Sequence, residues 1–151
     1  MYLLGYDLGS SSVKASLVNA ATGECISTAF FPKKEMEIIS LKSGWAEQNP
    51  RDWYNASLHT IQKILKKAAI DPNHIKGIGL SGQMHGLVML DKDNDVIRPS
   101  IIWCDQRTSN ECTEITEKVG AKRLIEITAN PALTGFTASK ILWVRNHEPE
   151  N

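Results

Sequence analysis

The hydrophobic and polar positions of the first 31 residues predict β-strands. Residues 2–7 form an apolar run long enough for a buried strand. Val13, Ala15 and Leu17 then alternate with residues 14, 16 and 18, and "NAATG" turns the chain into "ECISTAF", with Gly23 placed for a positive φ. This pattern predicts a three-stranded antiparallel meander.

The hydrophobic period becomes that of a helix after residue 49. Asn49 is a good helix cap, Pro50 suits the first helical position, and Asp52 favours the positive end of the helix dipole. Apolar residues follow at helical spacing: Trp53, Ala56, Ile61, Ile64, Leu65 and Ala68. The pattern predicts one helix that ends before "DPN" at residues 71–73.

The second half of the chain is expected to hold further strands and three helices. "IKGIGLSG" is typical of a buried strand, and "LVMLDKDNDVIRPSIIW" of a hairpin that enters another strand. Apolar faces predict helices over 106–119, 121–127 and 137–146. Because the strand after the first helix is expected to run parallel to the first strand, the predicted class is α/β, with strand ends that converge on a ligand.

Composition and charge narrow the classes of protein. The chain has 151 residues, of which 42% are hydrophobic and 23% charged, which indicates one domain with one core. Lys and Arg total 17, as do Asp and Glu, so neither nucleic acid nor an anionic membrane is an expected partner. Cys25, Cys104 and Cys112 lack metal-ligand spacing and are predicted to be buried, reduced thiols. With no signal peptide and no apolar stretch that could span a bilayer, the expected location is cytoplasmic.

The first candidate site is the segment "DLGSSSVK". Asp7 ends the first strand and is expected to face a crevice, while the turn after it directs backbone N–H and hydroxyl groups toward an anion. A carboxylate beside a phosphate site is chemically sensible when a divalent metal lies between them. Asp7 would then hold Mg²⁺, and Ser10, Ser11 and Lys14 would face phosphate oxygens. The alternative is an aspartate that caps a turn and serines that complete a hairpin, an arrangement that short turn motifs often produce.

The second candidate site combines "SGQMHG" with "IIWCDQR". His85 can exchange hydrogen bonds with sugar hydroxyls, and Met84 offers an apolar wall. An indole such as Trp103 can pack on the apolar face of a sugar, while Asp105 can accept from hydroxyls or pair with Arg107. In the alternative interpretation, Met84, His85 and Trp103 are core residues, and Asp105 caps a helix that begins near residue 106.

Three aspartates between these segments imitate a calcium loop. Asp91, Asp93 and Asp95 have the spacing of its first ligands, but Val96 stands where the loop needs glycine and Ile102 where it needs a bidentate glutamate. The segment is therefore expected to be a polar turn.

Several motifs resemble those of known kinases. "GYDLGSSSVK" resembles the first phosphate loop of the actin, hexokinase and sugar kinase superfamily. "GLSGQMHGLVMLD", "RPSIIWCDQR" and "GFTASKILWVRNHEPE" resemble the FGGY family of carbohydrate kinases, and "QMHG" resembles its members that act on xylulose. "SGWAEQNP", with Trp45 and Glu47, also resembles a family segment, although nothing physical in it fixes a role.

The resemblance implies an actin/hexokinase-like (ribonuclease H-like) ATPase fold. Residues 1–151 would be the amino-terminal sugar-binding domain of a longer protein, in which the catalytic base and most of the adenosine pocket lie beyond residue 151. The implied reaction transfers the γ-phosphoryl group of ATP, with Mg²⁺, to D-xylulose or a related ketose. The full-length protein is compatible with a homodimer.

The resemblance also assigns roles to the candidate residues. Asp7 would be the catalytic, metal-organising carboxylate; Gly9, Ser10, Ser11 and Lys14 would hold the nucleotide phosphates; Met84, His85, Trp103 and Asp105 would hold the sugar. Three alternatives remain open: a family member that takes ribulose, gluconate or a deoxyhexulose, an actin-like scaffold that needs no sugar, and a nuclease of the ribonuclease H type. "QMHG" argues against the scaffold, and a nuclease needs several clustered carboxylates where only Asp7 is well placed.

Overall fold

The computed structural model describes residues 1–151, which divide into two compact units. The first unit contains residues 1–37 and 50–83, and the second contains residues 38–49 and 84–151. Each unit has its own cluster of buried hydrophobic side chains. The single core expected from composition is therefore wrong, because residues 38–49 pack with the second half of the chain and not with the sheet.

The first unit is built on a four-stranded mixed sheet. Its strands are β1 (Tyr2–Leu8), β2 (Val13–Asn19), β3 (Cys25–Phe31) and β5 (Ile75–Gly82), in the order β3-β2-β1-β5. The first three form an antiparallel meander, and β5 lies parallel to β1. Gly23, with φ 74°, turns β2 into β3. The predicted meander and the predicted parallel strand are both confirmed.

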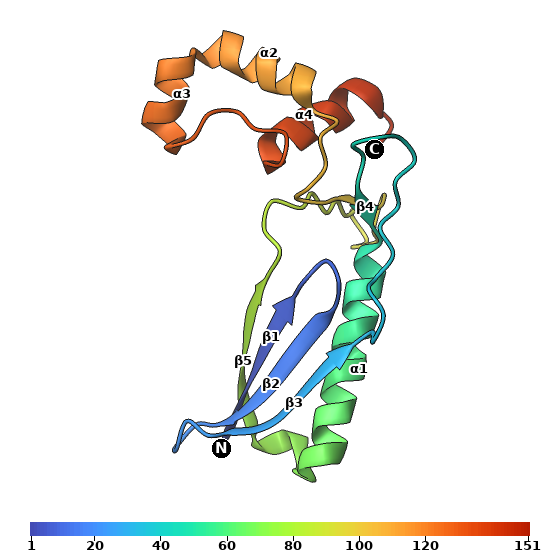
Figure 1. Ribbon diagram of the computed structural model, residues 1–151, viewed down its shortest axis with the longest axis vertical. Helices are drawn as coiled ribbons and strands as arrows, with labels where there is room; N and C mark the ends of the chain where they lie inside the picture. Colours follow the sequence, from blue (N-terminus) through green and yellow to red (C-terminus); the bar gives the residue numbers. More distant parts are fainter. The chain divides into compact units, whose positions relative to one another are not determined.

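Helix α1 (Pro50–Ala68) covers one face of this sheet. It packs on β2 and β3, where Figure 1 shows it alongside the blue meander. Leu4 and Leu17 from the strands and Ile64 from the helix are buried together, because alternate strand residues point to the same face. The Tyr6 hydroxyl donates a hydrogen bond to the Ser57 carbonyl at 3.2 Å, and burial raises the pKa of Tyr6. The predicted helix is confirmed, and its apolar side faces the sheet.

The edge strand β5 is covered far less than β1. By register, Ile78 lies beside Leu4 and Leu80 beside Tyr6, so both share the helix-facing side of the sheet. They remain 65% and 73% exposed, since α1 lies over β2 and β3. A short 3₁₀ turn, η1 (Pro72–His74), connects α1 to β5.

The second unit combines a two-stranded sheet with three helices. Strand β4 (Glu47–Gln48) is antiparallel to β6 (Ser100–Ile101), and the helices are α2 (Ser109–Val119), α3 (Ala121–Thr128) and α4 (Thr137–His147). Leu87, Ile101, Trp143 and Val144 form its buried cluster. All three helices were predicted, although α2 begins three residues later than expected because Thr108 is its cap residue. Strand β4 was not predicted, since two residues are too few to show a period.

The hairpin predicted between residues 87 and 103 is only partly formed. It consists of the isolated pairs Leu90–Val96 and Leu87–Ile101 and the short strand β6. At its tip the Asp91 carboxylate accepts hydrogen bonds from the backbone N–H groups of Asp93 and Asp95, both at 2.9 Å. The segment is thus the polar turn that was expected. Too few residues on either side of it are paired to make a regular hairpin.

The cysteines differ from their predicted environment. All three are free thiols, but Cys25 is exposed, and Cys104 and Cys112 are only partly buried. No helix is both long enough and apolar enough to cross a membrane.

Candidate functional site

The turn between β1 and β2 brings Asp7 and Lys14 together. The two residues lie opposite each other on the strands, and the Lys14 ammonium donates to the Asp7 carboxylate at 3.3 Å. Both side chains are more than half exposed, so this ion pair contributes little stability. The Gly9 N–H closes the turn on the Ser12 carbonyl at 3.1 Å, and a Cβ at Gly9 would lie 3.0 Å from that oxygen. The predicted phosphate turn is therefore tight, with its charged groups facing solvent.

Strand register adds a third polar residue, Ser81, to this site. Asp7 pairs with Lys14 on β2 and with Ser81 on β5, so the three residues form a row across neighbouring strands. The row lies close to where β1 and β5 end. The Gln83 N–H donates to the Leu8 carbonyl at 2.9 Å just beyond it, and a Cβ on Gly82 would come within 2.5 Å of the same oxygen. Glycine at position 82 is thus needed for the two strand ends to meet.

The residues of this turn suit a magnesium–phosphate group. No cluster of three or more His, Cys, Asp or Glu residues could hold a metal ion alone. Mg²⁺ commonly uses one or two carboxylates and completes its shell with water and substrate phosphates. One exposed carboxylate, Asp7, beside a serine-rich turn and an ammonium that can move therefore fits Mg²⁺ with a nucleotide phosphate.

In the second unit, His85 has an unusual backbone conformation and a ring that packs on a neighbouring aromatic side chain. Its φ of 65° is in the left-handed region, which few residues other than glycine adopt. The ring packs against Phe136, with 4.6 Å between ring centroids, while the residue as a whole stays exposed. The neighbouring Met84 is 70% exposed. Both side chains are thus accessible to a ligand, and neither is the core residue of the alternative interpretation.

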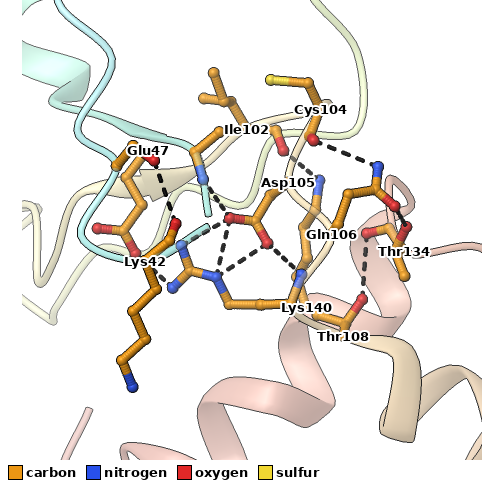
Figure 2. Close-up of polar contacts among 12 residues, drawn as sticks. Lys42, Glu47, Ile102, Cys104, Asp105, Gln106, Thr108, Thr134 and Lys140 are labelled. Carbon is orange, nitrogen blue, oxygen red and sulfur yellow. Dashed lines mark hydrogen bonds and ion pairs between the residues drawn. The ribbon is translucent and has the colours of Figure 1, made fainter. Parts of the chain in front are cut away.

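The two candidate residues of "IIWCDQR" have opposite environments. Trp103 is 51% exposed, whereas Asp105 is fully buried. The Asp105 carboxylate accepts hydrogen bonds from the Ala46 N–H at 2.6 Å, from the Arg107 N–H at 2.9 Å and from the Arg107 guanidinium at 2.7–3.0 Å (Figure 2). Both oxygens are therefore already satisfied inside the protein. This arrangement favours the pairing of Asp105 with Arg107 over direct contact with a sugar.

A buried network of charges surrounds this pair. The Glu47 carboxylate forms ion pairs with the guanidinium groups of Arg98 and Arg107, the second of them at 2.6 Å. The Arg107 guanidinium also lies over the Trp45 ring, 3.8 Å from its centroid, and 4.8 Å from the centroid of the Trp143 ring. Trp45 and Glu47, which had no assigned role in the sequence, thus hold β4 to the segment after β6.

Lys140 is the residue of this unit that sequence reasoning missed. It is fully buried, and its ammonium donates to the carbonyls of His85 at 2.7 Å, Gly135 at 2.7 Å and Ile102 at 3.0 Å. Burial lowers the pKa of Lys140 to about 8, against the pull of the Asp105 carboxylate, which raises it. A signal was present in the sequence, because positions 140, 143 and 144 share one helix face, on which Trp143 and Val144 are buried.

A pocket of about 370 Å³ lies beside His85. Its lining is mainly apolar and includes Leu124, Pro131, Leu133 and Phe136. Met84 and Trp103 do not line it. Of the residues predicted to hold sugar, His85 alone borders this pocket. The Lys140 ammonium connects His85 to the Trp103 segment, because it donates hydrogen bonds to the carbonyls of both His85 and Ile102.

The fold is the actin/hexokinase-like α/β fold found in sugar kinases. Residues 2–151 match the family model described as "FGGY family of carbohydrate kinases, N-terminal domain". The chain belongs to the FGGY family of carbohydrate kinases.

Similar proteins include kinases for more than one sugar. The chain is 44% identical over 149 residues to the xylulose kinase of Bacillus subtilis, and this alignment covers 99% of the chain and 29% of that protein. A xylulose kinase structure from Brucella ovis has a TM-score of 0.89 and 36% identity, covering 99% of this chain and 30% of the other. A gluconate kinase structure from Lactobacillus acidophilus has a TM-score of 0.84 and 26% identity, covering 99% and 29%. The chain thus spans about three tenths of the length of these relatives.

Proposed function

We propose that residues 1–151 are the amino-terminal, sugar-binding part of a cytoplasmic kinase that phosphorylates D-xylulose to D-xylulose 5-phosphate with ATP. The observation that carries this proposal is the match to xylulose kinases over 99% of the chain at up to 44% identity. The exposed Met84 and His85 side chains of "QMHG" and the polar row around Asp7 agree with it. The term full-length kinase denotes the polypeptide that carries these residues together with the portion that the relatives have in addition.

The first unit is proposed to hold the nucleotide phosphates. Mg·ATP supplies the phosphoryl group and neutralises the charge that develops during its transfer. Asp7 would hold the metal directly or through water, and the Gly9–Ser11 turn would direct N–H and hydroxyl groups at phosphate oxygens. Lys14 needs only to leave a weak, exposed ion pair with Asp7 to reach the same phosphates.

The second unit is proposed to hold the sugar. The His85 ring would exchange hydrogen bonds with sugar hydroxyls, while Met84 and Trp103 would cover apolar faces of the sugar. Asp105 would act indirectly, by keeping Arg107 and the Trp103 segment in place. No carboxylate of the chain is assigned as the general base, which we place in the portion beyond these residues.

A second candidate is a kinase of the same family for another sugar. The gluconate kinase of similar fold supports this candidate, because 26% identity and a TM-score of 0.84 accompany a different substrate. A panel of D-xylulose, ribulose, gluconate and a deoxyhexulose tests it with the full-length kinase. A kcat/KM at least tenfold higher for D-xylulose supports the main proposal, and preference for another sugar replaces it. If the rate of ATP hydrolysis is the same with and without each sugar, an actin-like scaffold is favoured instead.

The 151-residue chain alone is expected not to phosphorylate sugar. Transfer requires a base and a fully enclosed nucleotide, and we place both outside these residues. ADP release measured with and without D-xylulose should show no sugar-dependent turnover, while circular dichroism shows that the chain is folded. Sugar-dependent ADP release by the chain would contradict the proposed division of the active site.

The His85→Ala variant tests the sugar site in the full-length kinase. Loss of a hydrogen bond to a sugar hydroxyl should reduce kcat/KM for D-xylulose by about tenfold to a hundredfold, which corresponds to roughly 1–3 kcal/mol of transition-state binding. Sugar-independent ATP hydrolysis and the melting temperature should stay near those of the unmodified protein, since His85 is exposed.

The matched control is His74→Ala, which removes an exposed histidine from the η1 turn of the first unit. It should leave xylulose phosphorylation unchanged. If His85→Ala instead lowers every activity together with the melting temperature, His85 is a structural residue and has no place in the sugar site.

A further inference from the structure

Three backbone segments of the second unit converge on one buried ammonium group. The Lys140 Nζ atom donates to His85 O, Ile102 O and Gly135 O, at 2.7, 3.0 and 2.7 Å. An ammonium has three N–H donors, so all of them are used. The three segments are far apart in the sequence, and no strand pairing joins residue 135 to either of the others.

Two of these carbonyls adjoin the residues proposed to contact sugar. His85 carries one of them itself, and Ile102 immediately precedes Trp103. The third belongs to Gly135, which approaches Trp103 so closely that a Cβ at position 135 would lie 2.8 Å from the Trp103 carbonyl oxygen. The ammonium is therefore the common attachment point of both candidate sugar contacts.

The segment around Gly135 is also held in place by side-chain hydrogen bonds. The Thr134 hydroxyl donates to the Gln106 side chain at 2.7 Å, and the Thr108 hydroxyl donates to the Thr134 carbonyl at 3.2 Å (Figure 2). The Phe136 ring, one residue beyond Gly135, packs on His85. Residues 134–136 thus form a strap across the two sugar-contacting segments, and Lys140 bonds the strap and both segments at once.

We propose that Lys140 is a positioning residue, whose ammonium holds the His85, Ile102 and Gly135 carbonyls together and thereby sets the relative placement of the His85 and Trp103 side chains on the sugar. Lys140 itself is fully buried, so its proposed role is to act through these three carbonyls. The inference deepens the proposed function and rests on it. Its effect should fall on the sugar and spare the nucleotide, because the phosphate turn belongs to the other unit.

The direct test is Lys140→Met in the full-length kinase. Methionine keeps an aliphatic stem and removes all three donors. The KM for D-xylulose should rise at least tenfold, while the KM for ATP stays within twofold. The matched control is Lys118→Met, since Lys118 is 70% exposed on α2, and it should change neither value. Equal changes in both KM values, or no change in either, would overturn the proposal.

A second variant and a pH profile decide the matter if Lys140→Met does not fold. Gly135→Ala should push the strap away from Trp103 and raise the sugar KM alone. In the unmodified kinase, the neutral Lys140 amine can donate only two hydrogen bonds, so the sugar KM should rise as pH increases through about 8. A sugar KM that is insensitive both to pH and to Gly135→Ala would contradict the proposal.

The groups that face Lys140 define the controls for this profile. The Asp105 carboxylate and the Arg107 guanidinium act electrostatically on the Lys140 ammonium, and so does the side chain of Cys104. Cys104→Ser should therefore keep the pH dependence, and Lys140→Met should remove it. If Cys104→Ser abolishes the dependence, the thiol and not the ammonium is responsible.

Failure of the proposed function can be separated from failure of this inference. A full-length kinase that phosphorylates no ketose refutes the function. The placement of His85 and Trp103 is then read by NMR in the 151-residue chain, where both ring resonances should shift with a midpoint near the Lys140 pKa of about 8. The shift should vanish in Lys140→Met, and its persistence there would refute the role of Lys140.

Discussion

Asp7→Asn is expected to reduce turnover of the full-length kinase by about a hundredfold or more. The substitution keeps the shape of the side chain and removes the negative charge proposed to hold magnesium beside the nucleotide phosphates. Loss of one such electrostatic contact at a reacting centre typically costs two to three orders of magnitude in rate. Steady-state kinetics with D-xylulose at saturating ATP and a range of Mg²⁺ concentrations measures the effect.

The matched control for this prediction is Asp52→Asn. Asp52 is an exposed carboxylate in the first turn of α1, within the same unit as Asp7. Its removal should leave turnover nearly unchanged. Near-normal turnover of Asp7→Asn would make Asp7 a turn residue and return the segment to the simpler interpretation of a capped hairpin.

The second large effect is expected from Asp105→Ala, and it concerns stability. The Arg107 side chain is only 1% exposed, and loss of its bidentate partner leaves a buried guanidinium with Glu47 alone. Breaking a buried ion pair from one side typically costs about 3–5 kcal/mol. Because Glu47 remains, we expect the lower end of that range, about 3 kcal/mol, for unfolding of the second unit.

Urea denaturation of the 151-residue chain measures this loss. Three of the four tryptophans, Trp45, Trp103 and Trp143, belong to the second unit, so the intrinsic fluorescence of the chain reports mainly on that unit. Asp93→Asn is the control, because Asp93 pairs with Lys92 on the surface, where 67% of its side chain is exposed. A loss no larger than that of the control would show that the buried pair is not what stabilises this unit.

The sequence predicted the regular elements of the first unit well because their periods are long and uninterrupted. The local sequence pattern is enough to predict two seven-residue strands that are joined by a turn at Gly23. It is also enough to predict a 19-residue helix that begins at Pro50. The two-unit organisation could not be predicted in this way. It depends on tertiary contacts between residues 38–49 and the second half of the chain. A local hydrophobic period does not encode such contacts.

The candidate site was predicted in part, for similar reasons. Asp7 and Lys14 follow from a strand, a turn and a strand, so their contact could be expected. The burial of Asp105 could not, because it depends on Ala46, 59 residues earlier, and on a strand of two residues. The position of Lys140 on an apolar helix face indicated that it is buried, but its partners are backbone carbonyls, which side-chain patterns do not identify.

The open edge of β5 bears on how the protein is made in a cell. The meander of β1 to β3 pairs neighbours in sequence, whereas more than 60 residues separate β1 from β5, so we expect β5 to be the last strand of the sheet to form. Once formed, it presents an unpaired edge beside the exposed side chains of Ile78 and Leu80. Edges of this kind recruit strands from other molecules. We therefore expect a newly synthesised chain to be more prone to aggregate the longer this edge stays uncovered.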